Sequence, residues 1–89
     1  MSTMILTAET IEKDLLAFFT QEVLTGDEEV RITETTPLFD GLLDSLGTLR
    51  LVVHLEETYQ LTVADGELVP DNFHSPRSIA HYVLGKLAE

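Results

Sequence analysis

Residues 44–60 read DSLGTLRLVVHLEETYQ, and this stretch decides the fold because its apolar residues recur at helical spacing. At about 100° per residue, they cover a wide arc of a helix over 45–60. The members of this arc are Leu46, Leu49, Leu51, Val52, Val53, Leu55 and Tyr59. Such a broad arc predicts a central helix packed against more than one neighbour. Asp44 is placed to cap it, and the remaining face carries Gly47, Arg50, His54 and Glu57.

Two further helices are expected on either side of this one. In residues 8–24 one stripe holds Ile11, Leu15, Phe18, Phe19 and Val23, which is typical of an amphipathic helix. Thr7 is a suitable N-cap for it, and Gly26 lies near its end. Ser75-Pro76 is a strong helix-start signal. It predicts a last helix over about 76–88, with an inner face made of Ile79, Tyr82, Val83 and Leu87.

The segments between the helices differ in length. Residues 25–43 form a long connection, which we expect to be a loop tied to the core by Leu38, Phe39, Leu42 and Leu43. Glu67-Leu68-Val69 is expected to make one helical turn before Pro70, and Phe73 is expected to anchor in the core. The predicted fold is all-α: a small bundle of three main helices plus one short helix. Residues 1–7 form a tail, and residues 8–89 a single domain.

Composition limits the classes of function. The chain has 89 residues, of which 16 are acidic and 5 basic, and its net charge of −11 disfavours binding to nucleic acid or to an anionic membrane surface. It has no cysteine, which excludes disulfides, thiolate nucleophiles and cysteine-type zinc sites. No apolar run approaches the length of a membrane span, and no signal-peptide pattern occurs. We therefore expect a soluble, cytoplasmic monomer.

The sequence contains none of the common catalytic or metal-binding motifs. The window around Ser45 is not Gly-x-Ser-x-Gly, and nine helical residues turn His54 to the side opposite Ser45. We expect all three histidines to be surface residues. The acidic residues do not follow a calcium-loop pattern, and no phosphate-binding loop or HExxH motif occurs. The chain is therefore expected to be no enzyme and to hold no metal.

One serine lies in a setting that suits an anionic group. Ser45 follows the long connection and stands at the start of the predicted central helix. A helix N-terminus presents unpaired N–H groups and the positive end of the dipole, which favour a phosphate. Asp44 could cap the helix or hold a divalent cation beside that phosphate. From Asp44-Ser45-Leu46 alone, a simple cap is the better interpretation.

The wider context resembles the phosphopantetheine attachment region of acyl and peptidyl carrier proteins. The family has an apolar loop that leads to Asp-Ser-Leu at the start of helix II. This chain has a similar stretch, Thr36-Pro37-Leu38-Phe39-Asp40-Gly41-Leu42-Leu43-Asp44-Ser45-Leu46. Leu55-Glu56-Glu57-Thr58-Tyr59 resembles the end of that helix, and 68–76 followed by Ile79 resembles the approach to helix IV. These matches extend over about residues 9–88.

The resemblance implies a non-catalytic carrier. A phosphopantetheinyl transferase using coenzyme A would attach 4′-phosphopantetheine to Ser45, with Asp44 and Leu46 helping it to recognise the site. The thiol of this arm would hold an acyl or aminoacyl group as a thioester. An adenylating ligase or an acyltransferase would load the arm, and downstream synthase and tailoring enzymes would use the load.

Departures from the family's pattern indicate which kind of carrier this chain resembles. Fatty-acid carriers commonly have acids two and five positions after the serine, where this chain has Gly47 and Arg50. A partner that reads an acidic helix II should bind this one poorly. We therefore expect a free-standing carrier of polyketide or nonribosomal peptide assembly, with partner docking through Leu46, Arg50, Val53, His54 and Glu57. Two alternatives stay open: an acidic interaction module without a prosthetic group, and, less favoured, a hydrolase using Ser45.

Overall fold

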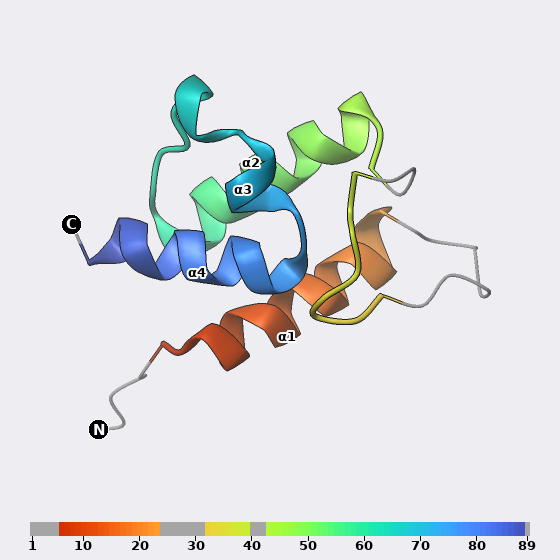
Figure 1. Cartoon of the computed structure of the whole chain (residues 1–89), viewed down its shortest axis with the longest axis horizontal. Coiled ribbons are helices and arrows are strands. Elements are labelled where there is room, and N and C mark those ends of the chain that lie inside the picture. The colour runs from red at the N-terminus through yellow and green to blue at the C-terminus, as the bar shows by residue number, and fades with distance from the viewer. Residues whose placement is uncertain (1–5, 24–31, 40–42, 89) are drawn as a thin grey trace.

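The computed structural model describes residues 6–23, 32–39 and 43–88, and all regular structure within these ranges is helical (Figure 1). The helices are α1 (Ala8–Phe18), α2 (Ser45–Tyr59), α3 (Pro70–Phe73) and α4 (Pro76–Leu87). A π-helical turn, Phe19–Val23, continues α1, and a 3-10 turn, Asp65–Glu67, precedes α3. The predicted bundle of three main helices and one short helix is confirmed.

The starts of the three main helices are fixed by the side chains expected to cap them. The Thr7 hydroxyl accepts a hydrogen bond from the Thr10 amide at 3.2 Å, which starts α1. The Ser75 hydroxyl accepts one from the Ser78 amide at 3.2 Å, and Pro76 occupies the first turn of α4. Asp44 caps α2 in the same way.

Two helix boundaries differ from the prediction. The first helix is α-helical only to Phe18, and the wider π-turn that follows lets the consecutive Phe18 and Phe19 both be buried. The short helix begins at Pro70 instead of ending before it, because proline suits the first turn of a helix and Val69 is extended. Residues 24–27, where the first helix was expected to end, lie outside the described residues.

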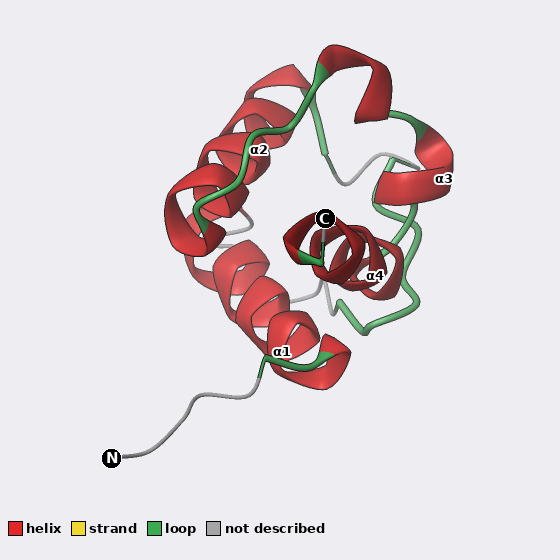
Figure 2. Ribbon diagram, turned by 90° about the vertical axis from the view of Figure 1, so that its left-hand side faces the viewer, coloured by secondary structure: helices red, strands yellow, loops and turns green. Residues whose placement is uncertain are grey.

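The central helix of the bundle is α4, and not α2 as the apolar arc of α2 suggested. α4 contacts α1, α2 and α3, and Figure 2 shows it end-on among them. α2 buries only one narrow stripe, through Gly47, Leu51 and Leu55. Three other members of its predicted buried arc, Leu46, Leu49 and Val53, are exposed, with 58%, 59% and 43% of each residue's surface accessible to solvent.

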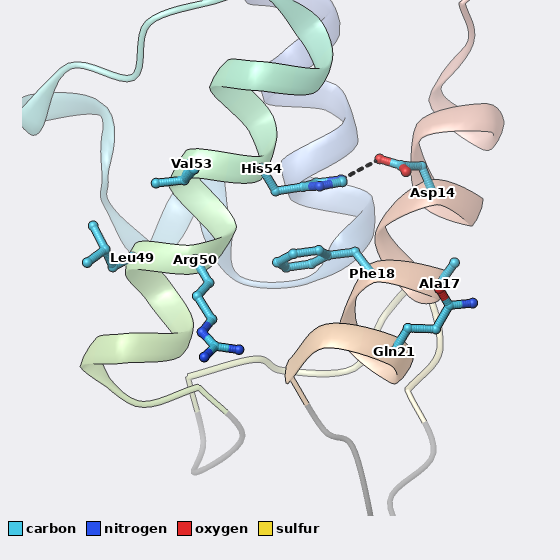
Figure 3. Close-up of a pocket in the computed structure, with 8 residues that line it drawn as sticks. All are labelled: Asp14, Ala17, Phe18, Gln21, Leu49, Arg50, Val53 and His54. Carbon is cyan, nitrogen blue, oxygen red and sulfur yellow. Dashed lines mark hydrogen bonds and ion pairs between the residues drawn. The ribbon is translucent and has the colours of Figure 1, made fainter.

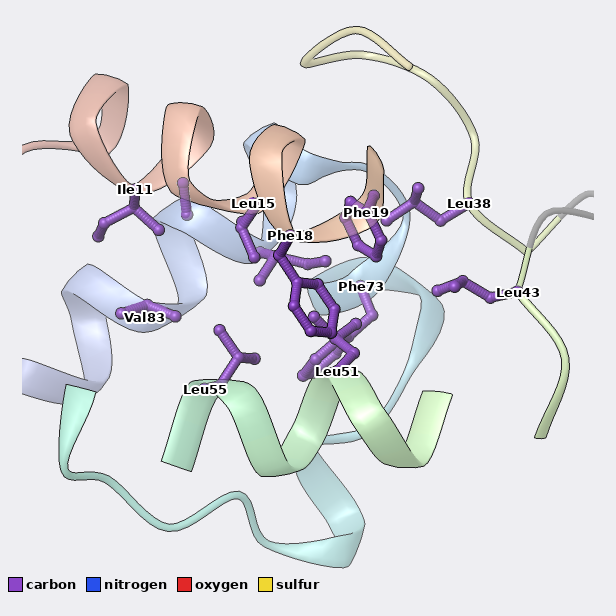
Figure 4. Close-up of a cluster of buried hydrophobic side chains, with 12 residues drawn as sticks. Ile11, Leu15, Phe18, Phe19, Leu38, Leu43, Leu51, Leu55, Phe73 and Val83 are labelled. Carbon is purple, nitrogen blue, oxygen red and sulfur yellow. The ribbon is translucent and has the colours of Figure 1, made fainter. Parts of the chain in front are cut away.

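The core joins side chains from every helix and from the long connection (Figure 4). Its members are Ile11, Leu15, Phe18, Phe19, Leu38, Leu43, Leu51, Leu55, Phe73, Ile79, Ala80 and Val83. Leu38, Leu43 and Phe73 are therefore the anchors that the sequence predicted. Phe39 and Leu87 are exposed, contrary to expectation, and Leu42 lies outside the described residues.

Backbone hydrogen bonds attach the long connection to the start of α4. The Leu38 amide donates to the His74 carbonyl at 2.8 Å, and the Arg77 amide donates to the Glu34 carbonyl at 2.8 Å. The Leu43 amide donates to the Leu38 carbonyl at 3.0 Å. Because Leu43 immediately precedes the cap of α2, these bonds fix where that helix begins.

Candidate functional site

The candidate site is the start of α2, where a charged cap holds the first turn. The Asp44 carboxylate accepts a hydrogen bond from the Gly47 amide at 2.7 Å, and the Asp44 carbonyl accepts one from the Thr48 amide at 2.9 Å. Of the two roles considered for Asp44, the structure shows the cap. Gly47 is buried, so it is not part of the exposed face to which its position had assigned it.

Ser45 is the first residue of α2, and its side chain is exposed. In the part of the chain that the structure describes, its hydroxyl has no hydrogen-bond partner. The positive end of the helix dipole lies at the same point, and it favours a phosphate there. An exposed hydroxyl on a capped helix N-terminus therefore fits a phosphodiester-linked group such as phosphopantetheine.

Exposed apolar side chains lead along α2 away from Ser45. Leu46, Leu49 and Val53 are all exposed, whereas Leu51 and Leu55 on the opposite side are fully buried. A helix that shows aliphatic residues to water at this spacing offers a surface for another molecule. Arg50 and Glu57, also predicted to contact partners, are exposed on the same helix.

The sequence predicts His54 to be a surface histidine, but in the structure most of its side chain is covered. Its side chain is 21% exposed, its Nε2 lies 2.9 Å from Asp14 Oδ2, and its ring stacks on Phe18 with the ring centres 4.2 Å apart. These contacts turn His54 toward α1 and away from the Ser45 end of the helix. The structure therefore gives no support to a Ser45–His54 catalytic pair.

Asp14 is a site residue that the sequence did not single out. Its Oδ2 atom accepts a second hydrogen bond, from the Tyr59 hydroxyl at 2.7 Å, so this one oxygen joins α1 to two positions on α2. Burial, this hydrogen bond and the negative charge of Asp14 together raise the pKa of Tyr59 above the usual range of tyrosine. His54 and Tyr59 lie 40 and 45 positions after Asp14 in the sequence, and no local pattern could reveal contacts over such a separation.

An open groove of about 550 Å³ lies between α1 and α2 (Figure 3). Figure 3 shows His54 and Phe18 reaching into it from the two helices, with Arg50 nearer the start of α2. The complete lining is Asp14, Ala17, Phe18, Gln21, Leu49, Arg50, Val53 and His54. The groove therefore begins one turn beyond Ser45.

A second hollow, of about 280 Å³, lies on the other flank of α2. It is lined by Phe39, Thr48, Leu68, Val69, Pro70 and Phe73. Apolar side chains thus flank the start of α2 on both sides. Among the described residues, no cluster of three side chains could hold a metal ion, and no helix is long and apolar enough to cross a membrane.

Comparison with known proteins agrees with this geometry. The family described as "Phosphopantetheine attachment site" matches residues 21–83, a region that includes the whole of α2 and the second hollow beside it. The chain belongs to this family of phosphopantetheine-binding carriers. Such a carrier has 4′-phosphopantetheine attached covalently and holds its load on it as a thioester. It is not an enzyme, and works with a phosphopantetheinyl transferase and with separate loading enzymes.

Two curated relatives are D-alanyl carrier proteins. This carrier is 37% identical over 68 residues to the protein of Abiotrophia defectiva, a match that covers 75% of this chain and 86% of the relative. It is 39% identical over 59 residues to the protein of Listeria welshimeri, covering 65% and 76% of the two chains.

A solved structure shares the fold. One of its chains superposes on this carrier with a TM-score of 0.71 at 26% identity, covering 78% of this chain and 97% of the other. That structure is described as "Crystal structure of FAD-dependent dehydrogenase". Because about 78% of an 89-residue chain spans nearly all of it, the matched chain is of carrier size.

Proposed function

We propose that Ser45 is the residue that carries the phosphopantetheine arm. The observation that supports this most strongly is the exposed Ser45 hydroxyl on the capped first turn of α2, inside the region matched by the family. Asp44 holds that turn in place, and the exposed Leu46 beside it gives the transferase an apolar contact. In this proposal residues 8–89 form a single carrier domain, preceded by a short tail.

We propose further that the load is an aminoacyl group attached by an adenylating ligase. The support for this is the identity of 37–39% with carriers named for a D-alanyl load. The thiol of the arm supplies the thioester linkage that a cysteine-free chain lacks. The transferase draws on coenzyme A, so we place the carrier in the cytoplasm.

The pathway that we favour is a specialised one of the polyketide or nonribosomal peptide type. Arg50 is exposed on α2 where fatty-acid carriers commonly have an acid, which favours partners with a negatively charged contact surface. The likeness to a carrier-sized chain from a dehydrogenase structure supports a redox tailoring enzyme among the downstream partners.

Partners would dock on α2 close to Ser45. Leu46, Arg50, Val53 and Glu57 are exposed there and supply aliphatic contacts of the kind that interfaces bury, together with charge for selectivity. His54 contributes less directly, because most of its side chain is occupied by Asp14 and Phe18. It supports the docking surface by holding α2 against α1.

Intact mass spectrometry tests the assignment of Ser45. Purified protein is incubated with coenzyme A and a transferase of broad specificity, and we expect a gain equal to one phosphopantetheine. The Ser45→Ala variant should show no gain. Ser78→Ala is the matched control, because it keeps the backbone amide that the cap of α4 uses and loses only the contact between the Ser75 and Ser78 hydroxyls, and this variant should be modified like the wild type. A folded wild-type protein that gains nothing and carries no arm already would favour the acidic interaction module instead.

A second assay tests the load. The arm-bearing protein is offered D-alanine and a panel of other amino acids, each with ATP and a candidate adenylating ligase. Charging with a D-alanyl group alone would place the carrier in the role of its named relatives and contradict the specialised pathway. Charging with another amino acid and poor use of D-alanine would support it.

A further inference from the structure

The groove between α1 and α2 has an anionic oxygen in an otherwise largely apolar wall. Asp14 Oδ2 accepts two hydrogen bonds, one from His54 and one from the Tyr59 hydroxyl. In the described part of the chain, Asp14 Oδ1 has no partner, and about a third of the side chain is exposed. The aliphatic and aromatic parts of Phe18, Leu49 and Val53 surround the same space. Arg50 lines the end of the groove nearer the start of α2, so the groove suits a ligand with an apolar body whose cationic group lies at the Asp14 end.

The groove is also within reach of Ser45. His54, the partner of Asp14, lies nine residues beyond Ser45, which is about 14 Å along the helix axis and half a turn around it, so the arm has to pass over the Leu49 side of α2 to bring its load to Asp14. A phosphopantetheine arm has a backbone comparable to about five residues and can extend about 17 Å. Leu49 lies one turn beyond Ser45 and about 40° around the helix, so it forms the near rim of the groove.

The group at the end of the arm is favoured as the occupant of the groove, because it is tethered to Ser45. A group on a short flexible linker is present at an effective concentration in the millimolar range. A groove with only millimolar affinity for that group would then be about half-filled. The groove volume of about 550 Å³ lies within the range of small-molecule pockets.

From these observations we propose that the α1–α2 groove is a resting site for the aminoacyl end of the arm, with the α-ammonium group of the load facing Asp14. This inference rests on the proposed attachment at Ser45 and adds a selectivity of the carrier itself. A neutral acyl load of the same size would lack the charge contact and would occupy the groove less. The apolar wall holds both loads, and Asp14 distinguishes between them.

The test compares two loads that differ only by the ammonium group. A transferase of broad specificity attaches the alanyl or the propionyl form of the arm to Ser45, each as an amide-linked analogue that resists hydrolysis. The readout is the set of backbone amide NMR shifts of the groove residues, relative to the protein with an unloaded arm. We expect shifts at Phe18, Val53 and His54 that correspond to an alanyl occupancy about two- to five-fold above the propionyl one, the range for a partly exposed ion pair.

Two variants separate the charge contact from a general effect. Asp14→Asn keeps the shape of the side chain and should remove the alanyl–propionyl difference. Glu9→Gln makes the same change of charge at an exposed position on α1 outside the groove, and should preserve the difference. If Asp14→Asn fails to fold, the comparison of the two loads on the wild-type protein decides alone.

Three results would overturn the groove assignment while leaving Ser45 modified. These are equal shifts for the two loads, shifts confined to the hollow around Phe39, Val69 and Phe73, or loss of the difference in Glu9→Gln as well. A protein that takes no arm at all is recognised beforehand by its unchanged mass. That result would remove the proposed function, and the groove assignment with it.

Discussion

Replacing Asp44 by alanine should destabilise the protein by loosening the turn that presents Ser45. The substitution removes the carboxylate that accepts the 2.7 Å hydrogen bond from the Gly47 amide, and it leaves that part-buried amide without its partner. It also removes a negative charge from the positive end of the α2 dipole. Loss of an N-cap of this kind typically costs 0.5–2 kcal/mol, and the charge places this one at about 1–2 kcal/mol.

Thermal unfolding followed by circular dichroism measures this effect. For a domain of this size, a loss of about 1 kcal/mol lowers Tm by roughly 4–8 °C, so Asp44→Ala should melt roughly 4–16 °C below the wild type. Asp44→Asn is the matched control, because asparagine caps helices about as well as aspartate but lacks the charge. It should recover most of the lost stability.

The order of the three proteins decides the matter. We expect the wild type to have the highest Tm, Asp44→Asn a slightly lower one and Asp44→Ala the lowest, with the larger difference in Tm between the two variants. If Asp44→Ala melts with the wild type, the cap does not hold the turn, and the reasoning from the 2.7 Å bond is refuted.

Three further predictions concern other parts of the carrier. Leu51→Ala should cost about 2–5 kcal/mol in urea unfolding, because Leu51 is fully buried. Leu49→Ala, two residues away and exposed, should change stability little, and similar losses in both would contradict the observed face of α2. Hydrogen bonds from Lys86 and from the Ala64 amide lower the pKa of Glu67, so Glu67 stabilises the fold above the usual pKa of glutamate and ceases to do so as the pH falls through the lowered value. In thermal melts from about pH 7 to about pH 3, the Tm of Glu67→Gln should therefore fall less steeply with decreasing pH than the Tm of the wild type. An equal fall of Tm in both proteins would count against the Lys86 contact. Arg50→Glu should slow the turnover of at least one partner enzyme while Ser45 modification stays near the wild-type rate, and unchanged rates with every cognate partner would remove Arg50 from the docking surface.

Local signals in the sequence predicted the helices and the position of Ser45 well. Thr7, Asp44 and Ser75 are capping residues whose preference depends on the adjacent turn alone, and all three cap as predicted. The buried positions of α1 follow from the same short-range periodicity. The resemblance around Ser45 depends on a continuous motif, which can also be recognised without knowing the fold.

The sequence could not show which apolar residues of α2 are buried. Leu49 and Leu51 are chemically the same, and only the packing of the other segments against α2 leaves one exposed and the other in the core. The broad apolar arc therefore predicts a central helix, whereas in the structure part of this arc is an exposed surface beside Ser45.

The groove could not be foreseen for a related reason. It depends on the contact of Asp14 with His54 and Tyr59, which joins residues of two helices that are distant in sequence. The same contact explains why His54 is partly buried although its spacing placed it on the polar face. Such contacts are set by packing, which no local pattern specifies.

Locating the arm within the chain tests the central claim most directly. Trypsin cleaves after Arg31 and Arg50, and the intervening peptide 32–50 contains Ser45 as its only serine. After treatment with a transferase and coenzyme A, tandem mass spectrometry should find phosphopantetheine on this peptide, with the fragment ions assigning it to Ser45. An arm on another residue, or an unmodified peptide 32–50 from folded protein, would contradict the assignment of Ser45 as the attachment residue of this carrier.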